Sequence, residues 1–369
     1  MKPPCEALVS VVIPAFNAQE TLPETLASVR AQTHGALEIL IIDDGSTDAT
    51  ARIAAAFCAE NPHARLVSTL NRGVAAARNL GIAQARGQFV APLDADDLWH
   101  PGHLALLTQR ALEAPALPGF VFAHSRLIDR DAYVVRSSPQ VKIAGRAVRQ
   151  LACNNFVGNG SALLLSRAAA VEAGGYDERL RAAGLEGCED YLLQLKIAAR
   201  HPIASIPEFT VGYRQLPGAM SRDAVRMFGS DRLAYALFRD AFPEIDIDPA
   251  VRRWYRASRG LGLARYHLRA RRPVTAMRRV VAAVLDDPLG ALAALAYDVE
   301  RVAATRPSGH ASAGVAPIPF RDFPIDTASG GSALDPPARP RLMHRLEQAR
   351  MNRLAAIDRA DRPGPEGSR

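Results

Sequence analysis

Short β-branched runs alternate with helical segments from Ala7 to Asp94, and this alternation constrains the fold more than any other feature of the chain. The apolar residues follow a period of two in the runs and a helical period between them. We expect strands at 7–14, 37–44, 64–68 and 87–94, and helices at 18–32, 47–60 and 73–85. This order predicts an α/β fold, in which a Rossmann-like, mainly parallel sheet carries helices on both faces.

Polar residues follow three of these predicted strands at their carboxyl ends. The segments are PAFN at 14–17, DDGSTD at 43–48 and DADD at 94–97. Ligands bind beyond the carboxyl ends of the strands in parallel sheets. The three segments should therefore meet at one crevice, although they are separated in sequence.

The DADD segment places three carboxylates, Asp94, Asp96 and Asp97, within four residues. Like charges this close repel each other unless a cation or well-placed donors compensate. Mg²⁺ and Mn²⁺ prefer oxygen ligands, and one or two carboxylates suffice when a diphosphate supplies further ligands. The alternative is a solvated cap of the helix expected near Pro101, with Asp97 as the capping residue. Capping explains one carboxylate and not three, so we favour a cation site.

The remaining sequence divides the chain into four parts. We expect a catalytic or binding domain at 1–220, with a nucleotide-binding half at about 1–115 and an acceptor half at about 116–220. Helices are expected at 221–303, because apolar periodicity is interrupted at Phe242-Pro243, Arg272-Pro273 and Asp287-Pro288. The Pro-, Gly-, Ser- and Ala-rich tail at 304–369 predicts no fixed structure apart from a basic helix near 341–356.

Charge and cysteine usage limit where the chain acts. The four cysteines lie far apart without zinc or disulfide spacing, and the first apolar run has no cleavage site after it, so we expect a cytoplasmic protein. The formal charge of +7 comes mostly from arginines late in the chain. These arginines have three interpretations: a solvated helix face, a contact with anionic phospholipid, or a nucleic-acid patch. We rank the nucleic-acid patch lowest, because no aromatic residues are interleaved with the arginines. No apolar stretch approaches the roughly 20 residues that span a bilayer, so membrane contact would be peripheral, on the inner face of the plasma membrane.

Six ordered motifs between about Val9 and Asp223 resemble those of inverting family 2 glycosyltransferases of the GT-A fold. They are VSVVIPAFNAQETLPETLASVRAQT, EILIIDDGSTDAT, NRGVAAARNLGIAQARGQFVAPLDADDLWHP, GNGSALLLSRAAAVEAGGYDE, CEDYLLQLKIA and YRQLPGAMSRD. The resemblance implies a nucleotide-sugar transferase with a divalent cation. The rest of the chain resembles the helical tail of such enzymes only loosely. The QxxRW motif of processive members is absent, which disfavours a polymerising synthase.

The resemblance also assigns donor-binding roles. Asp96 of the DXD-type segment would ligate the cation directly, and Asp94 would lie near the ribose and the cation. Asp97 would support these two residues from behind or cap the following helix. Asp44 would accept a hydrogen bond from the nucleobase while Asp43 orders its loop, although Asp-Gly-Ser is also a common turn. The other expected members of the nucleotide-sugar site are Pro14, Phe16, Asn17 and Arg78.

The acid pair that opens CEDYLLQLKIA has two interpretations. Acids in a first helical turn are favoured by the helix dipole. Transfer of a sugar to a hydroxyl, however, needs a base that removes the acceptor proton during attack. The resemblance assigns that role to Asp190, with Glu189 orienting the helix start or the acceptor. One base opposite a cation-held diphosphate implies a single displacement with inversion.

The loop after the last predicted strand carries Arg214, Ser221 and Arg222, which suit neutralisation of a leaving diphosphate. A surface loop with a Ser-capped helix is the alternative. The motifs together predict a hexosyltransferase that moves one sugar, most plausibly from UDP, to a saccharide or lipid-linked hydroxyl in cell-surface polysaccharide or glycolipid synthesis. The rival from another class is a non-catalytic protein that binds a nucleotide sugar or glycan. A nucleotidyltransferase is disfavoured, because PAFNAQE has no glycine-rich phosphate loop.

Overall fold

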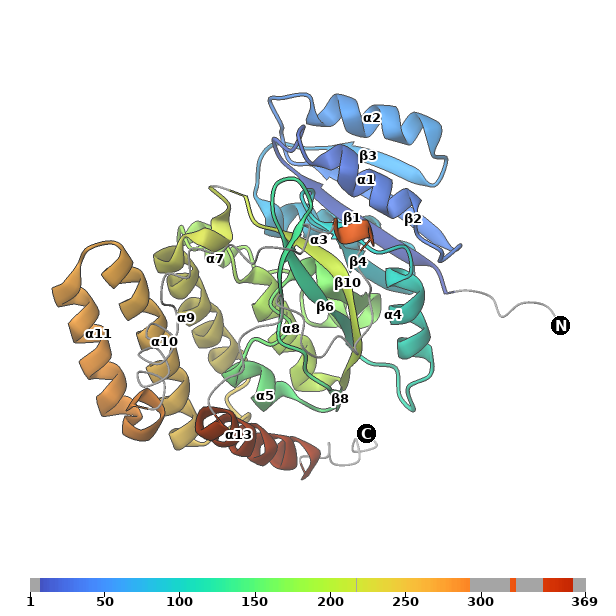
Figure 1. Ribbon diagram of the computed structural model, residues 1–369. Helices are drawn as coiled ribbons and strands as arrows, with labels where there is room; N and C mark the ends of the chain where they lie inside the picture. Colours follow the sequence, from blue (N-terminus) through green and yellow to red (C-terminus); the bar gives the residue numbers. More distant parts are fainter. Residues whose placement is uncertain (1–6, 217, 293–318, 323–340, 361–369) are drawn as a thin grey trace.

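One mixed sheet forms the centre of the computed structural model, which describes residues 7–216, 218–292, 319–322 and 341–360 (Figure 1). Its strands are β1 (Val9–Ala15), β2 (Leu37–Asp43), β3 (Ala64–Ser68), β4 (Phe89–Pro92), β5 (Leu98–Trp99), β6 (Phe120–Ile128), β7 (Val134–Ser137), β8 (Ala144–Gly145), β9 (Leu163–Ser166) and β10 (Ile203–Arg214). They lie in the order β3-β2-β1-β4-β9-β6-β10-β5, with β7 beside β6 and β8 beside β10.

The amino-terminal half of the sheet is parallel, as the alternating pattern predicts. β1 pairs in parallel with β2 and β4, and β2 pairs in parallel with β3. Every residue of β1 is buried, which explains its unbroken apolar run. β9 then inserts antiparallel between β4 and β6, while β6 and β10 are parallel. The carboxyl ends of β1, β2 and β4 therefore share one edge, where the three polar segments begin.

Helices cover both faces of this sheet. The helices are α1 (Leu22–Arg30), α2 (Thr50–Glu60), α3 (Val74–Gln84), α4 (His103–Leu112), α5 (Val148–Cys153), α6 (Arg167–Glu172), α7 (Arg179–Ala182), α8 (Glu189–Arg200), α9 (Ala224–Ala241), α10 (Pro249–Arg269), α11 (Pro273–Asp286) and α13 (Arg341–Ala360), with short 3₁₀ turns η1 (Gly160–Ala162), η2 (Met220–Arg222) and η3 (Phe320–Asp322). Alternate residues of β1 point to opposite faces, because the side-chain period of a strand is two. Val11 and Ile13 pack with α1, α2 and α4, whereas Val12 packs with α3, α5 and α8.

The helices beyond β10 extend the molecule away from β2 and β3, with α10 and α11 forming an antiparallel hairpin (Figure 1). The predicted proline breaks are confirmed, because α9 ends just before Phe242 and α11 begins at Pro273. Among the described residues, no helix is both long and apolar enough to cross a membrane.

Two described segments of the tail pack on the sheet domain. The predicted basic helix is present as α13, and its buried Asp358 accepts hydrogen bonds from the backbone and side chain of Arg149 in α5. Residues 319–322 also have a defined position, which differs from the expectation of no fixed structure there. Phe320 is buried against Ile128 and Val134, a long-range contact that composition alone could not reveal. The other parts of the predicted unstructured tail lie outside the described residues.

Candidate functional site

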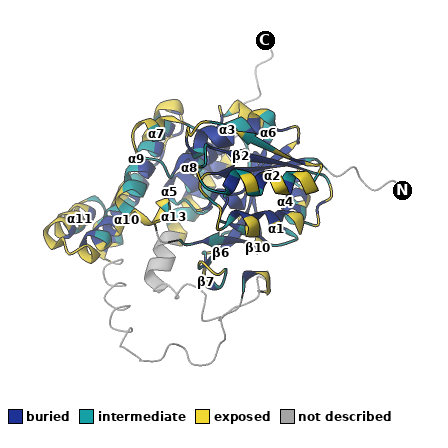
Figure 2. Cartoon of the chain, turned by 90° about the horizontal axis from the view of Figure 1, so that it is seen from above, coloured by how far each residue is buried: buried dark blue, intermediate teal, exposed yellow. Residues whose placement is uncertain are grey.

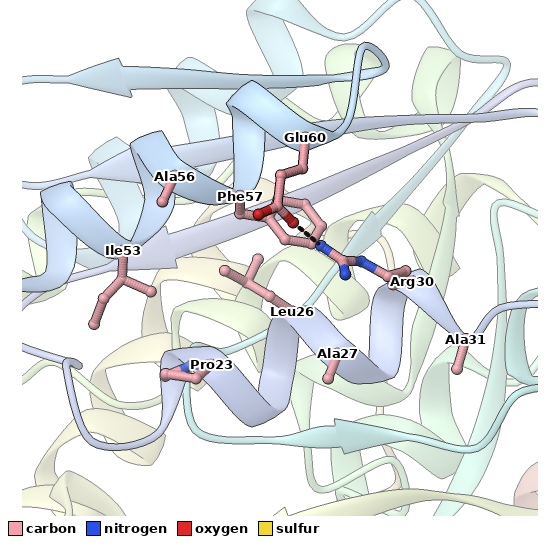
Figure 3. Close-up of a pocket in the computed structure, with 9 residues that line it drawn as sticks. All are labelled: Pro23, Leu26, Ala27, Arg30, Ala31, Ile53, Ala56, Phe57 and Glu60. Carbon is pink, nitrogen blue, oxygen red and sulfur yellow. Dashed lines mark hydrogen bonds and ion pairs between the residues drawn. The ribbon is translucent and has the colours of Figure 1, made fainter.

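Two hollows of similar size differ in chemistry. One is a groove of about 460 Å³ between α1 and α2, lined mainly by apolar side chains (Figure 3). Its two charged residues, Arg30 and Glu60, pair with each other at 3.0 Å and are both exposed. No residue of the predicted site lines this groove. The other hollow, a cleft of about 450 Å³, opens at the carboxyl edge of the sheet and contains carboxylates. The cleft is therefore the candidate site.

Most residues predicted from the sequence line this cleft although they come from distant segments. The predicted residues that line it are Pro14, Phe16, Asn17, Arg78, Asp94, Asp96, Glu189, Asp190, Arg214 and Ser221. Asp43, Asp44 and Arg222 are not among its lining residues. The fold thus brings the strand ends of the first half and the start of α8 to one place.

Arg78 of α3 connects the two acidic segments. Its Nη2 donates to Asp94 Oδ1 and its Nη1 donates to Glu189 Oε1 at 3.0 Å. The guanidinium also lies over the ring of Tyr176, 5.2 Å from the centroid. Burial alone would lower the pKa of Arg78, but Asp94, Tyr176 and Glu189 raise it well above its ordinary value. The residue therefore stays charged and holds one acid from each segment, which goes beyond covering the flank of α3.

Asp96 is the acid of the DADD segment that faces the cleft without a side-chain partner among the described residues. Asp94 is engaged by Arg78, and Asp97 is fully buried behind both. Burial, followed by the charge of Asp94, raises the pKa of Asp96 to about 6. A carboxylate this close to a second one favours a nearby cation.

Asp97 ties the acidic loop to the rest of the domain. It accepts hydrogen bonds from Ser161 Oγ at 2.6 Å, from the backbone nitrogen of Arg214 at 2.9 Å and from Asn159 Nδ2 at 3.3 Å. Burial and the neighbouring Asp96 and Asp94 raise the pKa of Asp97 well above its ordinary value. The interpretation of Asp97 as a helix cap is wrong, because α4 begins only at His103 and the strand β5 intervenes.

Arg214 uses its guanidinium to hold this loop. Nε donates to the carbonyl of Asp96 at 2.7 Å, Nη1 donates to the carbonyl of Arg130, and Nη2 donates to Glu24. The side chain is almost completely buried. Ser221 and Arg222 lie in the exposed turn η2, and the cap of the following helix is Asp223 and not Ser221.

The Asp43-Asp44 pair lies below the cleft. Asp44 accepts hydrogen bonds from the backbone nitrogens of Arg72 at 2.8 Å and Gly73 at 2.7 Å, and Asp43 accepts one from the nitrogen of Ser46 at 3.1 Å. Both side chains are buried. In this structure, the pair therefore orders the loop after β2 and the start of α3.

Glu189 and Asp190 lie in the first turn of α8 and line the cleft together with Asp94 and Asp96 of the loop after β4. Glu189 is held at both oxygens, by Arg78 and by the backbone nitrogen of Gly187 at 2.8 Å. Within the described parts of the chain, Asp190 Oδ1 accepts one hydrogen bond, from the nitrogen of Tyr191 at 2.7 Å. Burial, followed by the charge of Glu189, raises the pKa of Asp190 to about 7, although Arg78 lowers it. This value suits a group that takes up a proton near neutral pH.

Sequence reasoning missed part of the cleft lining. Asn155, Asn159, Tyr213, Met220 and Met227 contribute to it. Asn159 and Tyr213 lie within or beside quoted motifs, so their positions were available as a signal. Met227 comes from α9, which no motif connects to the site.

The residues present fit a divalent cation in their chemistry. In the described part of the chain, no three or more His, Cys, Asp or Glu side chains are arranged so that they could hold a metal ion by themselves. Asp94 and Asp96 provide two carboxylates, which suffices for a cation that takes further ligands from a diphosphate and water. Burial and the charge of Asp94 raise the pKa of Asp96 although Arg214 and Arg78 lower it, so a bound cation would stabilise the ionised carboxylate further.

Comparison with known proteins gives the family. Residues 10–170 match the model of Glycosyl transferase family 2. The uncharacterized glycosyltransferase YibD of Escherichia coli is 44% identical over 105 residues, 28% of this chain and 30% of that protein. A chondroitin synthase of Escherichia coli is 32% identical over 151 residues, 40% of this chain and 22% of that protein. The chain thus spans less than a third of the length of either relative.

Solved structures share the fold. The mannosyltransferase PcManGT from Pyrobaculum calidifontis, in complex with GDP-Man and Mn²⁺, has a TM-score of 0.55 at 18% identity, covering 98% of this chain and 89% of that chain. S. aureus TarS 1–349 in complex with UDP-GlcNAc has a TM-score of 0.50 at 16% identity, covering 75% of this chain and 91% of that chain. At these identities the likeness concerns the fold, which is GT-A. Residues 10–170, somewhat less than half of the chain, are thus similar to glycosyl transferase family 2.

Proposed function

We propose that this chain transfers one sugar from a nucleoside-diphosphate sugar to an acceptor hydroxyl, with inversion at the anomeric carbon. One observation supports the proposal: Asp96 and Asp190 line the same cleft without a side-chain hydrogen-bond partner among the described residues, while Arg78 pairs with a neighbouring acid in each of their segments. Asp96 suits a cation-bound diphosphate, and Asp190 suits an acceptor proton. A protein that only binds glycans would need no such unpaired base.

Asp190 acts as the base in this proposal. As the acceptor oxygen attacks the anomeric carbon, its proton moves to the Asp190 carboxylate. The new carbon–oxygen bond forms while the bond from the anomeric carbon to the diphosphate oxygen breaks, and the nucleoside diphosphate leaves with that electron pair. Glu189 pairs with Arg78 at 3.0 Å and orients the start of α8. A single displacement of this kind inverts the configuration.

The donor would lie between the first strand ends and Arg78. Phe16, which is 50% exposed, offers apolar surface to the base beside Pro14 and Asn17. Asp44 remains our candidate for the nucleobase contact, because each of its carboxylate oxygens has a second lone pair beyond the bonds described, while Asp43 orders the loop through Ser46. Ser221 and Arg222 would approach the diphosphate from η2, and Arg214 would support the loop beneath it.

Asp94 and Asp96 would hold Mn²⁺ or Mg²⁺. When bound, such a cation neutralises charge that develops on the leaving diphosphate. PcManGT, which shares the fold, was solved with Mn²⁺. Within the chain, Arg78 and Arg214 keep the two carboxylates in place, since the first binds Asp94 and the second binds the backbone of Asp96.

We further propose a UDP-sugar as donor and a saccharide or lipid-linked sugar as acceptor, within polysaccharide or glycolipid synthesis. TarS binds UDP-GlcNAc and one relative is named a chondroitin synthase, which supports this class. The acceptor would enter past Asn155 and Asn159, on the half of the domain from about 116 to 220, and past Met227 of α9.

The purified chain should release nucleoside diphosphate from one member of a panel of nucleotide sugars when Mn²⁺ and an acceptor are present. Chelation of the cation should stop the release. An anomeric product of inverted configuration, read by nuclear magnetic resonance, would support the single displacement. Binding of a nucleotide sugar without any turnover, across the panel and with varied acceptors, would favour the non-catalytic rival.

A further inference from the structure

The outer face of α11 presents an apolar ridge to solvent. The ridge consists of Val274, Met277, Val281 and Leu285, whose side chains are between 51% and 79% exposed. These positions recur at helical spacing, so they lie along one side of the helix. The opposite side carries Ala276 and Ala283, which are buried, with Ala283 packed against α10. Figure 2 shows the α10 and α11 hairpin as an exposed projection from the buried domain core.

Two features show that this ridge is more than scattered surface. Leu289 and Leu292, in the helical turns that follow, are also largely exposed, as is Leu268 at the end of α10. Contiguous exposed apolar side chains of this kind mark contact with another surface, whereas isolated ones are normal. The ridge is convex, because it lies on a helix that forms the outer layer of the hairpin.

Arginines border the ridge. Arg271 and Arg272 lie at the turn between α10 and α11, and Arg278 lies one position beyond Met277. All three are exposed, and none pairs with a carboxylate within the described residues. The two acids at the end of α11 are already engaged, since Asp286 pairs with Arg256 at 2.8 Å and Asp287 pairs with Arg350 at 2.9 Å. The face is therefore apolar and positive.

We propose that the α11 ridge docks on an anionic phospholipid bilayer, with its apolar side chains in the interface and the bordering arginines on the headgroups. An amphipathic helix that lies flat in a bilayer has this arrangement of apolar and basic faces. A second copy of the chain is a poorer occupant, because twofold pairing of the ridges would bring uncompensated arginines together. This surface lies outside the catalytic cleft, so the proposal does not depend on transfer.

Co-sedimentation of the full chain with vesicles tests the surface. The chain should bind vesicles of equal parts phosphatidylglycerol and phosphatidylcholine, and salt should weaken this binding. Each basic residue near an anionic surface strengthens binding roughly fivefold, about 1 kcal/mol. The double variant Arg272→Gln/Arg278→Gln should therefore bind roughly twenty-five times more weakly. The matched control Arg52→Gln/Arg136→Gln removes the same charge from exposed positions on α2 and β7 and should bind as the unaltered chain does.

A second variant isolates the apolar contribution. Met277→Gln/Leu285→Gln keeps the charge and alters only exposed side chains, so folding should be unaffected. It should bind at least tenfold more weakly to the anionic vesicles. Nucleotide-sugar turnover in free solution, where present, should stay unchanged, which separates this proposal from the proposed function.

Several results would overturn the proposal. They are equal binding to vesicles of phosphatidylcholine alone, absence of binding to either kind, and unchanged binding by both double variants. A concentration-dependent dimer that Met277→Gln/Leu285→Gln dissociates would instead assign the ridge to a second copy of the chain.

Discussion

The acidic loop after β4 and the acid pair that opens α8 are both anchored by Arg78, but different residues support them. In each segment, Arg78 engages one acid: Asp94 in the loop and Glu189 in the helix. In each, a neighbouring acid remains without a side-chain partner among the described residues and has a raised pKa, about 6 for Asp96 and about 7 for Asp190. The buried guanidinium of Arg78 thus engages one acid in each segment, and a neighbouring acid of that segment lines the cleft.

The two segments differ in how they are supported. The loop carries a third acid, Asp97, which is fully buried and accepts three hydrogen bonds. The helix start has Ser230, whose Oγ accepts a hydrogen bond from the nitrogen of Cys188 at 3.0 Å. We infer that the loop is built to hold a fixed geometry, as a cation requires, whereas the helix start positions a single base.

Replacement of Arg78 should have the largest effect, because it removes the charge that both segments share. Arg78→Leu removes the ion pair of half-buried Asp94 and leaves buried Glu189 with the backbone nitrogen of Gly187 but no cation, which should lower the free energy of unfolding by about 3–5 kcal/mol and abolish transfer. Urea denaturation measures the first effect. Arg52→Gln, an exposed arginine of α2, is the control and should stay within about 0.5 kcal/mol. A stable, active Arg78→Leu variant would show that the two segments are independent.

Asp96→Asn should affect only the loop side of the comparison. We expect transfer to be lost and donor affinity in Mn²⁺ to weaken more than tenfold. The unfolding free energy at neutral pH should not fall. The neutral amide avoids both the cost of burying a charge and the repulsion from Asp94. Near-wild-type turnover of this variant in chelated buffer would contradict the role of Asp96.

Much of the fold and part of the site could be predicted from the sequence. Strand and helix periodicity places the ends of β1 and β4 at one edge, so Phe16 and Asp96 could be expected in one cleft. The partners could not be predicted, because Arg78 meets Glu189, and Arg214 meets the backbone of Asp96, only through long-range packing. Residue type alone therefore suggested that Arg214 neutralises a diphosphate, whereas its donors are directed to Asp96, Arg130 and Glu24.

The pH dependence of the transfer rate and of stability should report on Asp190 at the start of α8. Asp190 must be ionised to accept a proton, so the transfer rate should fall about tenfold per pH unit below its pKa of about 7. Stability should show the opposite sign. Because the folded-state pKa of Asp190 is raised above its ordinary value of 3.8, the folded chain binds more protons between these values, and the unfolding free energy should fall as pH rises through that window. In Asp190→Asn, the part of the pH dependence of the unfolding free energy that Asp190 causes should disappear. An unchanged pH dependence in this variant would contradict the raised pKa.

Two serine variants should give the smallest effects and compare the supports directly. Ser161→Ala removes a donor from buried Asp97 and should cost about 1–3 kcal/mol of unfolding free energy. Ser230→Ala leaves the nitrogen of Cys188 without its acceptor and should cost about 1 kcal/mol. Thermal or urea unfolding of both variants shows which one loses more unfolding free energy. A larger cost for Ser230→Ala would show that the helix start, and not the loop, is the more constrained segment.

Asp190→Asn tests the central claim most directly, that the cleft contains a base for an acceptor proton. Donor affinity in Mn²⁺ by calorimetry and turnover with one identified acceptor are measured on the same preparation, with Glu189→Gln as the neighbouring control. We predict nearly unchanged donor affinity and a turnover reduced about 10² to 10⁴-fold for Asp190→Asn, with a milder loss for Glu189→Gln. Full turnover of Asp190→Asn would contradict the account, and a loss confined to Glu189→Gln would transfer the role of base to that residue.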